Sequence, residues 1–178
     1  MTEDAETGEH GLISNVYITV DGASVFHMKY WGDSVEPNLV TGFLSAIASF
    51  AREVSKEAVL KTVSIPPLKI AALQVMEEPQ VIVCIIADES FPILAAEEIL
   101  QAIAKVFLDR HSQDIMNLRG VDLTSELRKE VHTALVSSLK LFIDRLRKIK
   151  MREEMAPRKG VSEKSEAGKE AIDFLEKL

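Results

Sequence analysis

Residues 12–30 read LISNVYITVDGASVFHMKY, and this stretch decides how the fold begins. Apolar and β-branched residues, which favour strands, lie on both sides of Asp21-Gly22. An Asp-Gly pair between two such runs is typical of a tight type I′ turn, because both central residues of that turn need a positive φ. The stretch therefore predicts an antiparallel β-hairpin.

A helix is predicted after the hairpin and its loop, from about Asn38 to Glu57. Pro37 suits a position just before the first turn. Apolar residues recur here at steps of three and four, which is the period of a helix with one face on the core. This apolar stripe consists of Val40, Phe43, Leu44, Ile47, Phe50, Ala51 and Val54.

The opposite side of this helix is small and uncharged, although exposed helix positions usually carry Lys and Glu. A neutral face loses little hydration when it is covered, and small side chains allow another backbone to come close. Two alternatives are that the third helix of the same chain covers this face, or that the face has no role. We expect a partner interface there, at Thr41, Gly42, Ser45, Ala46 and Ser49.

Three further strands are predicted at residues 59–65, 68–76 and 80–87, and each break between them contains proline. The last of these is almost entirely apolar, which is typical of a central strand buried on both faces. The first lies beside Pro66 and Pro67, which suit an edge position. With the hairpin, these strands predict a five-stranded, mostly antiparallel sheet.

Two more helices follow the strands. The first begins near Ser90, a residue suited to an N-cap, and ends around His111. The second begins at Asp122 or Thr124 and keeps its apolar stripe for about seven turns. The element order ββαβββαα predicts an α+β fold.

One domain, residues 12–151, is expected between two polar ends. Residues 1–11 are acidic and without periodicity, which is typical of a disordered leader. Residues 152–178 are low in apolar residues and predict a mostly disordered tail.

The composition predicts a cytoplasmic protein. The net charge of −7 over 178 residues argues against nucleic acid as a partner, since nucleic-acid-binding domains are usually basic. The single cysteine, Cys84, lies in the apolar run VIVCIIA and cannot form an internal disulfide. No apolar run approaches the roughly 20 residues of a membrane-spanning helix, and the acidic N-terminus does not resemble a signal peptide.

No pattern predicts catalysis, a metal or a cofactor. The four histidines fall on different predicted elements with no cysteine nearby, so metal-ligand spacing is absent. No Gly-rich phosphate loop follows a strand. Adjacent carboxylates such as Glu77-Glu78 point apart, whereas a catalytic acid and base must face one substrate. We therefore expect a protein that is not an enzyme and has no cofactor.

The end of the third helix is basic. Each Lys or Arg near an anionic membrane contributes about 1 kcal/mol, so a cluster predicts weak, salt-sensitive contact with such a surface. A solvated helix end is the alternative, because cations suit the C-terminal end of a helix dipole. The clustered cations are Arg145, Arg147, Lys148, Lys150 and Arg152.

The element order and local sequences resemble the longin domain family over about residues 12–150. The hairpin at 12–30 is similar to the longin opening, in which the second strand ends in an aromatic residue. LVTGFLSAIASFAREV at 39–54 resembles the first longin helix with its paired aromatics. The strands within 59–88 resemble the longin meander, and AIAKVFLDRH at 102–111 resembles the second helix.

This resemblance implies a longin-like, or profilin-like, sheet with one helix on one face and two on the other. It also implies a subunit or scaffold in membrane-trafficking or small-GTPase machinery. The implied partner is another longin or roadblock domain, a small GTPase or a second copy of this chain. The membrane-fusion members carry a heptad-repeat segment and an anchor after the domain, so we expect an anchor-free protein, peripheral at membranes.

Three alternatives to this assignment remain. One is a roadblock-like module that binds GTPases or dimerises, although roadblock chains begin with a helix and this chain begins with a hairpin. Another is a regulatory scaffold without a GTPase. An enzyme of unknown type ranks third.

Overall fold

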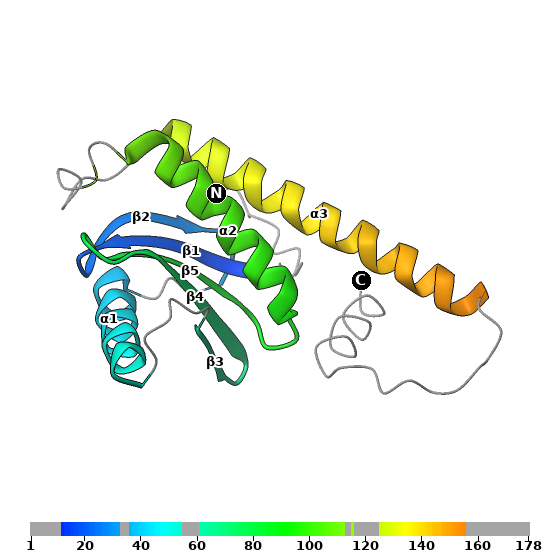
Figure 1. Ribbon diagram of the computed structural model, residues 1–178, viewed down its shortest axis with the longest axis horizontal. Coiled ribbons are helices and arrows are strands. Elements are labelled where there is room, and N and C mark those ends of the chain that lie inside the picture. The colour runs from blue at the N-terminus through cyan, green and yellow to red at the C-terminus, as the bar shows by residue number, and fades with distance from the viewer. Residues whose placement is uncertain (1–11, 33–35, 55–60, 113–114, 116–124, 156–178) are drawn as a thin grey trace, which may run out of the picture.

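The computed structural model describes residues 12–32, 36–54, 61–112, 115 and 125–155, without the side chains of residues 48, 50–54, 61 and 152–155. The fold is α+β, with a sheet between its helices (Figure 1). The elements are β1 (Ile13–Val20), β2 (Ala23–Lys29), α1 (Pro37–Val54), β3 (Lys61–Ile65), β4 (Leu68–Met76), β5 (Val81–Asp88), α2 (Ile93–His111) and α3 (Ser125–Met155).

The five strands form one open sheet in the order β2-β1-β5-β4-β3, and every neighbouring pair is antiparallel. β5 lies at the centre with Val81 through Ala87 buried, which confirms the position that its apolar sequence predicts. β3 is an edge strand, as its neighbouring prolines predict. The order of the strands along the chain does not predict that β1 lies between β2 and β5.

The hairpin of β1 and β2 has the predicted turn. Asp21 and Gly22 have positive φ values of 48° and 78°, as a type I′ turn requires. The Asp21 N–H donates to the Gln80 carbonyl oxygen at 2.8 Å, and the Gln80 N–H donates to Asp21 Oδ1 at 2.8 Å. Since Gln80 directly precedes β5, these two bonds fix the turn to the central strand.

The two faces of the sheet are covered by different helices. α2 and α3 pack on one face, where β1 and β5 contribute residues such as Ile18 and Ile85. α1 packs on the other face, as Figure 1 shows. The apolar cluster under α1 consists of Tyr17, Val40, Leu44, Ala72, Ile82, Cys84 and Ile86.

α3 lies along α2 and runs in the opposite direction. Arg110 near the end of α2 bonds to Glu130 near the start of α3. Arg145 in the second half of α3 bonds to Glu98 near the start of α2. The buried side of α3 carries Leu127, Val131, Leu135, Phe142 and Leu146.

The start of α2 differs from the prediction. Ser90 is not its N-cap, because the helix begins at Ile93 and Pro92 holds the N-cap position with no side-chain cap. Ser90 instead donates both its N–H, at 2.8 Å, and its hydroxyl, at 2.5 Å, to Asp88 Oδ1. The serine therefore closes a turn after β5. Hydrogen bonding within such a turn is an alternative to helix capping for Ser and Asp side chains.

Other predicted boundaries lie partly outside the described residues. α1 ends at Val54, and the expected end at Glu57 is not described. The same holds for the leader at 1–11 and for the expected start of the third helix at residues 122–124. α3 continues to Met155, past the expected end of the domain at residue 151.

Candidate interaction surfaces

α1 is rotated about its axis relative to the predicted orientation. Val40 and Leu44 are buried, as expected. Phe43, predicted to be buried, is 36% exposed, whereas Thr41, predicted to point outward, is only 4% exposed. Both of these orientations were therefore predicted wrongly. Thr41 Oγ1 donates to the Asn38 carbonyl oxygen at 2.9 Å, so its hydroxyl is satisfied within the helix and can be buried.

α1 lies beside the turn of the β1–β2 hairpin. Ser45 is half-buried, and its Oγ lies 3.2 Å from the point that a Cβ on Gly22 would occupy. A long charged side chain would not fit against this tight turn. The neutrality of Ser45 is thus explained by the hairpin of the same chain. It is not explained by α3, which lies on the opposite face of the sheet.

An uncharged surface remains on the outward side of α1, and we call it the neutral α1 strip. Leu39 in this strip is 67% exposed and Phe43 is 36% exposed. The sequence predicts the three smaller members of this strip, whereas it places Phe43 in the core stripe and does not assign Leu39 to either face. The neutral α1 strip consists of Leu39, Gly42, Phe43, Ala46 and Ser49, all exposed.

Gly42 has open space around it in this structure. A Cβ built on Gly42 would have no heavy atom within 4 Å, outside its chain neighbours and its own helix backbone. Packing within the described part of the chain therefore does not require glycine at this position. Glycine in a helix interior costs about 1 kcal/mol relative to alanine.

A polar network is buried in the sheet on the α1 side. Asn15 Nδ2 donates to Ser14 Oγ at 3.1 Å, and Ser14 Oγ donates to the Ile86 carbonyl oxygen at 3.1 Å. Asn15 Oδ1 lies 2.9 Å from His27 Nε2, and the His27 ring stacks on Tyr17 with centroids 4.4 Å apart. These contacts satisfy polar groups at the sheet centre, which is the usual condition for burying them.

Burial also raises the pKa values of Tyr17 and Cys84, two titratable groups under α1. It raises the pKa of Tyr17 to about 12, with a smaller contribution from the nearby Cys84. It raises the pKa of the Cys84 thiol to about 12 as well. Both groups are therefore neutral at physiological pH, and Cys84 behaves as a small apolar side chain.

The predicted cations at the end of α3 differ in environment. Arg147 and Lys148 are exposed. Arg145 is also exposed but forms an ion pair with Glu98. Lys150 is half-buried, and the side chain of Arg152 lies outside the described residues. These residues therefore lie at one end of α3, but they differ in exposure and in ion pairing.

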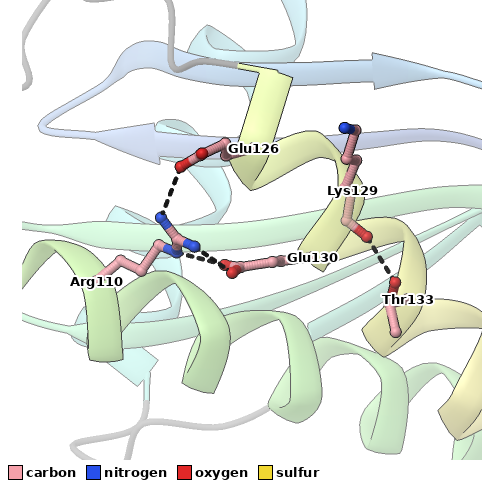
Figure 2. A network of polar contacts seen from close by, with 5 residues as sticks. All are labelled: Arg110, Glu126, Lys129, Glu130 and Thr133. Atoms are coloured by element: carbon pink, nitrogen blue, oxygen red, sulfur yellow. Dashed lines mark hydrogen bonds and ion pairs between the residues drawn. The ribbon is translucent and has the colours of Figure 1, made fainter.

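A groove that the sequence did not predict runs between α2 and α3. Arg110 of α2 reaches across to Glu126 and Glu130 of α3 (Figure 2). The hydrogen bond to Glu130 raises the pKa of Arg110, and the same bond lowers the pKa of Glu130. The groove has a volume of about 500 Å³ and is lined by Val106, Asp109, Arg110, Lys129, Glu130, Thr133, Ala134 and Ser137.

The three described histidines contact three different aromatic side chains. His27 stacks on Tyr17, and His132 Nδ1 lies 3.2 Å from Tyr30 Oη. His111 lies beside Phe107. Within the described ranges, no three His, Cys, Asp or Glu side chains are grouped so that they could hold a metal ion.

None of the described helices is both long and apolar enough to cross a membrane. Comparison with known protein families finds no family that matches the chain, and comparison with curated proteins finds no match either.

Proposed function

We propose that this protein is a non-catalytic interaction domain of the longin type that binds a folded partner through α1. In this role it serves as a subunit or scaffold in membrane-trafficking or small-GTPase machinery. The observation that carries the proposal is the neutral α1 strip, which is exposed and contains no charged residue.

The arrangement of elements supports a longin-like fold. The chain has the order ββαβββαα, with α1 on one face of a five-stranded sheet and two helices on the other. This is the arrangement that the sequence resemblance implies. Among the described elements, α1 is the helix on its face of the sheet, and its outer side carries exposed residues that a partner could contact.

The energetics of the strip support binding. Covering it removes apolar surface from water, and full burial of a side chain such as Leu39 contributes about 1.5–3 kcal/mol. No charged group has to lose its hydration shell, which would cost much more. Aromatic residues such as Phe43 are enriched at interface centres, and charged residues are depleted there.

The proposal is tested by adding charge to the strip. Ala46→Glu/Ser49→Glu places two carboxylates on the outward side of α1, where both native residues are exposed. Binding is measured by biolayer interferometry against purified small GTPases, longin domains and roadblock domains. Self-association is measured by sedimentation equilibrium. The double variant should weaken binding at least about 100-fold, since an unpaired buried charge costs several kcal/mol.

The matched control is Gln101→Glu/Ser125→Glu, which adds the same charge at exposed positions of α2 and α3. This control should bind like the wild type. Equal loss of binding in both double variants would show that net charge, and not α1, governs the interaction. A wild-type chain that stays monomeric and binds no member of the panel would contradict the proposed function.

A further inference from the structure

We propose that the outward face of α3 between Lys140 and Met151 docks on an anionic lipid bilayer. Two exposed apolar side chains enter the interfacial region of the lipid, and the neighbouring cations contact the headgroups. This proposal is independent of the partner that α1 binds.

Two large apolar side chains on this face are exposed to solvent. Leu141 is 62% exposed and Met151 is 60% exposed. Lys148 follows Leu141 by seven residues and precedes Met151 by three, so the three side chains lie on one side of the helix. Apolar and cationic groups therefore alternate along a single face.

The structure separates available cations from engaged ones. Lys140, Arg147 and Lys148 are exposed, and within the described part of the chain no hydrogen bond or ion pair engages their side chains. Arg145 is different, because it is bonded to Glu98. The face also includes one half-buried acid, Asp144. Among the side chains that the structure describes on this face, three available cations against one acid leave a positive charge.

The overall negative charge of the protein does not cancel this local charge. Glu126 and Glu130, which are the acids that bind Arg110, lie at the opposite end of α3. A helix rises about 1.5 Å per residue, so Glu126 is about 33 Å from Lys148 along the axis. Charges interact strongly only within a Debye length of about 8 Å at physiological salt. An anionic surface can therefore approach this end of α3 without repulsion from those acids.

The shape of the face favours a bilayer over an acidic protein segment. The exposed side of a single helix is convex and has no cavity to enclose a peptide. Leu141 and Met151 are about 15 Å apart along the axis, so both enter a flat interface when the helix lies parallel to it. Lys and Arg side chains are long enough to reach headgroups while their stems stay beside the apolar residues.

Cosedimentation of the full chain with vesicles tests the proposal. The wild type should bind phosphatidylcholine vesicles that contain phosphatidylserine, and should not bind vesicles of phosphatidylcholine alone. Binding should be lost at about 0.5 M salt, because the Debye length becomes much shorter. Arg147→Glu/Lys148→Glu should lower the partition coefficient at least about 30-fold, at roughly 1 kcal/mol for each cation removed.

The apolar contribution is tested separately. Leu141→Ser/Met151→Ser keeps every charge and should lower binding to the anionic vesicles about tenfold. The charge control is Lys29→Glu/Lys129→Glu, which changes the net charge equally at exposed positions away from this face and should bind like the wild type. Circular dichroism confirms that each variant is folded.

Four results would overturn the proposal. Two concern the wild type: equal binding to neutral and anionic vesicles, or no binding to anionic vesicles at low salt. The other two concern the variants: Leu141→Ser/Met151→Ser binds as well as the wild type, or Lys29→Glu/Lys129→Glu loses as much binding as Arg147→Glu/Lys148→Glu. Retention on immobilised polyglutamate without vesicle binding would assign the face to an acidic protein partner and would also exclude the bilayer.

Discussion

Gly22 and Gly42 illustrate two different reasons for a glycine. Gly22 has a φ of 78° in the hairpin turn, and Ser45 Oγ lies 3.2 Å from the point where its Cβ would be. A side chain there would be strained by the backbone and crowded by α1. Gly42 has ordinary helical surroundings and open space. Packing in the described part of the chain does not require the second glycine, and close approach of the proposed α1 partner would.

Gly42→Ala should therefore separate stability from binding. The variant should be about 1 kcal/mol more stable, because alanine has the higher helix propensity and no neighbour in the described part of the chain clashes with it. That gain corresponds to a Tm increase of about 2–4 °C for a chain of this size. Binding to an α1 partner should become weaker, because the added methyl group occupies the contact.

Ala46→Gly provides the matched control one turn away. It should lower stability by about 1 kcal/mol and keep the strip small. Tm is read by circular dichroism, and affinity by interferometry. Unchanged or tighter binding by Gly42→Ala would show that no backbone approaches α1 at this position.

Cys84 should be inaccessible to thiol reagents in the folded protein. It is fully buried in β5, and its pKa is raised to about 12. Because it is the only cysteine, labelling with dithionitrobenzoate reports this site alone. We expect negligible reaction at pH 8 in buffer and complete reaction in urea. A Ser49→Cys variant should label one thiol at once, and fast labelling of the wild type would contradict the burial.

The raised pKa of Cys84 also has a consequence at alkaline pH. The folded value of about 12 exceeds the ordinary value of 9.0, so the folded state favours the protonated thiol. This contribution to stability is complete below about pH 9 and is lost as the pH rises toward 12. Tyr17 acts in the same direction, because burial raises its pKa to about 12.

At the scale of elements, a small network of ion pairs connects the end of α2 to the start of α3. Arg110 bonds to Glu130 and Glu126 on successive turns of α3 (Figure 2). The paired side chains are exposed to solvent, and exposed ion pairs contribute little to stability. The apolar side of α3, which includes Leu127 and Val131, supplies most of the packing between the helices.

Arg110→Met should lower Tm slightly at neutral pH and low salt. The pKa of Glu130 is lowered from its ordinary value of 4.5 by the bond to Arg110, so this bond stabilises the fold above that pH and is lost as Glu130 becomes protonated. The difference in Tm between variant and wild type should therefore shrink below about pH 4.5 and in high salt.

Lys105→Met is the control, because it removes an exposed cation from the same helix. It should show no comparable dependence on pH. A Tm difference for Arg110→Met that persists under acid conditions would mean that lost packing of the arginine stem, and not the ion pair, causes the effect.

At the scale of the whole molecule, local residue patterns predict the helices and strands more accurately than they predict which side chains are exposed. The Asp21-Gly22 turn, the central position of β5 and the edge position of β3 followed from residue type and period. The rotation of α1 did not follow, because Thr41 and Phe43 flank the buried Val40 and Leu44 on opposite sides of the helix, and only packing against the rest of the fold decides which one is buried.

The sequence by itself determined the order of the helices and strands, because hydrophobic period and turn chemistry act over a few residues. Only the tertiary structure decided that β1 lies beside β5, that Arg145 pairs with Glu98, and that Leu39 joins the neutral α1 strip. The physical reason is that these outcomes depend on how elements far apart in the chain pack together, and packing is set by the shapes of both partners.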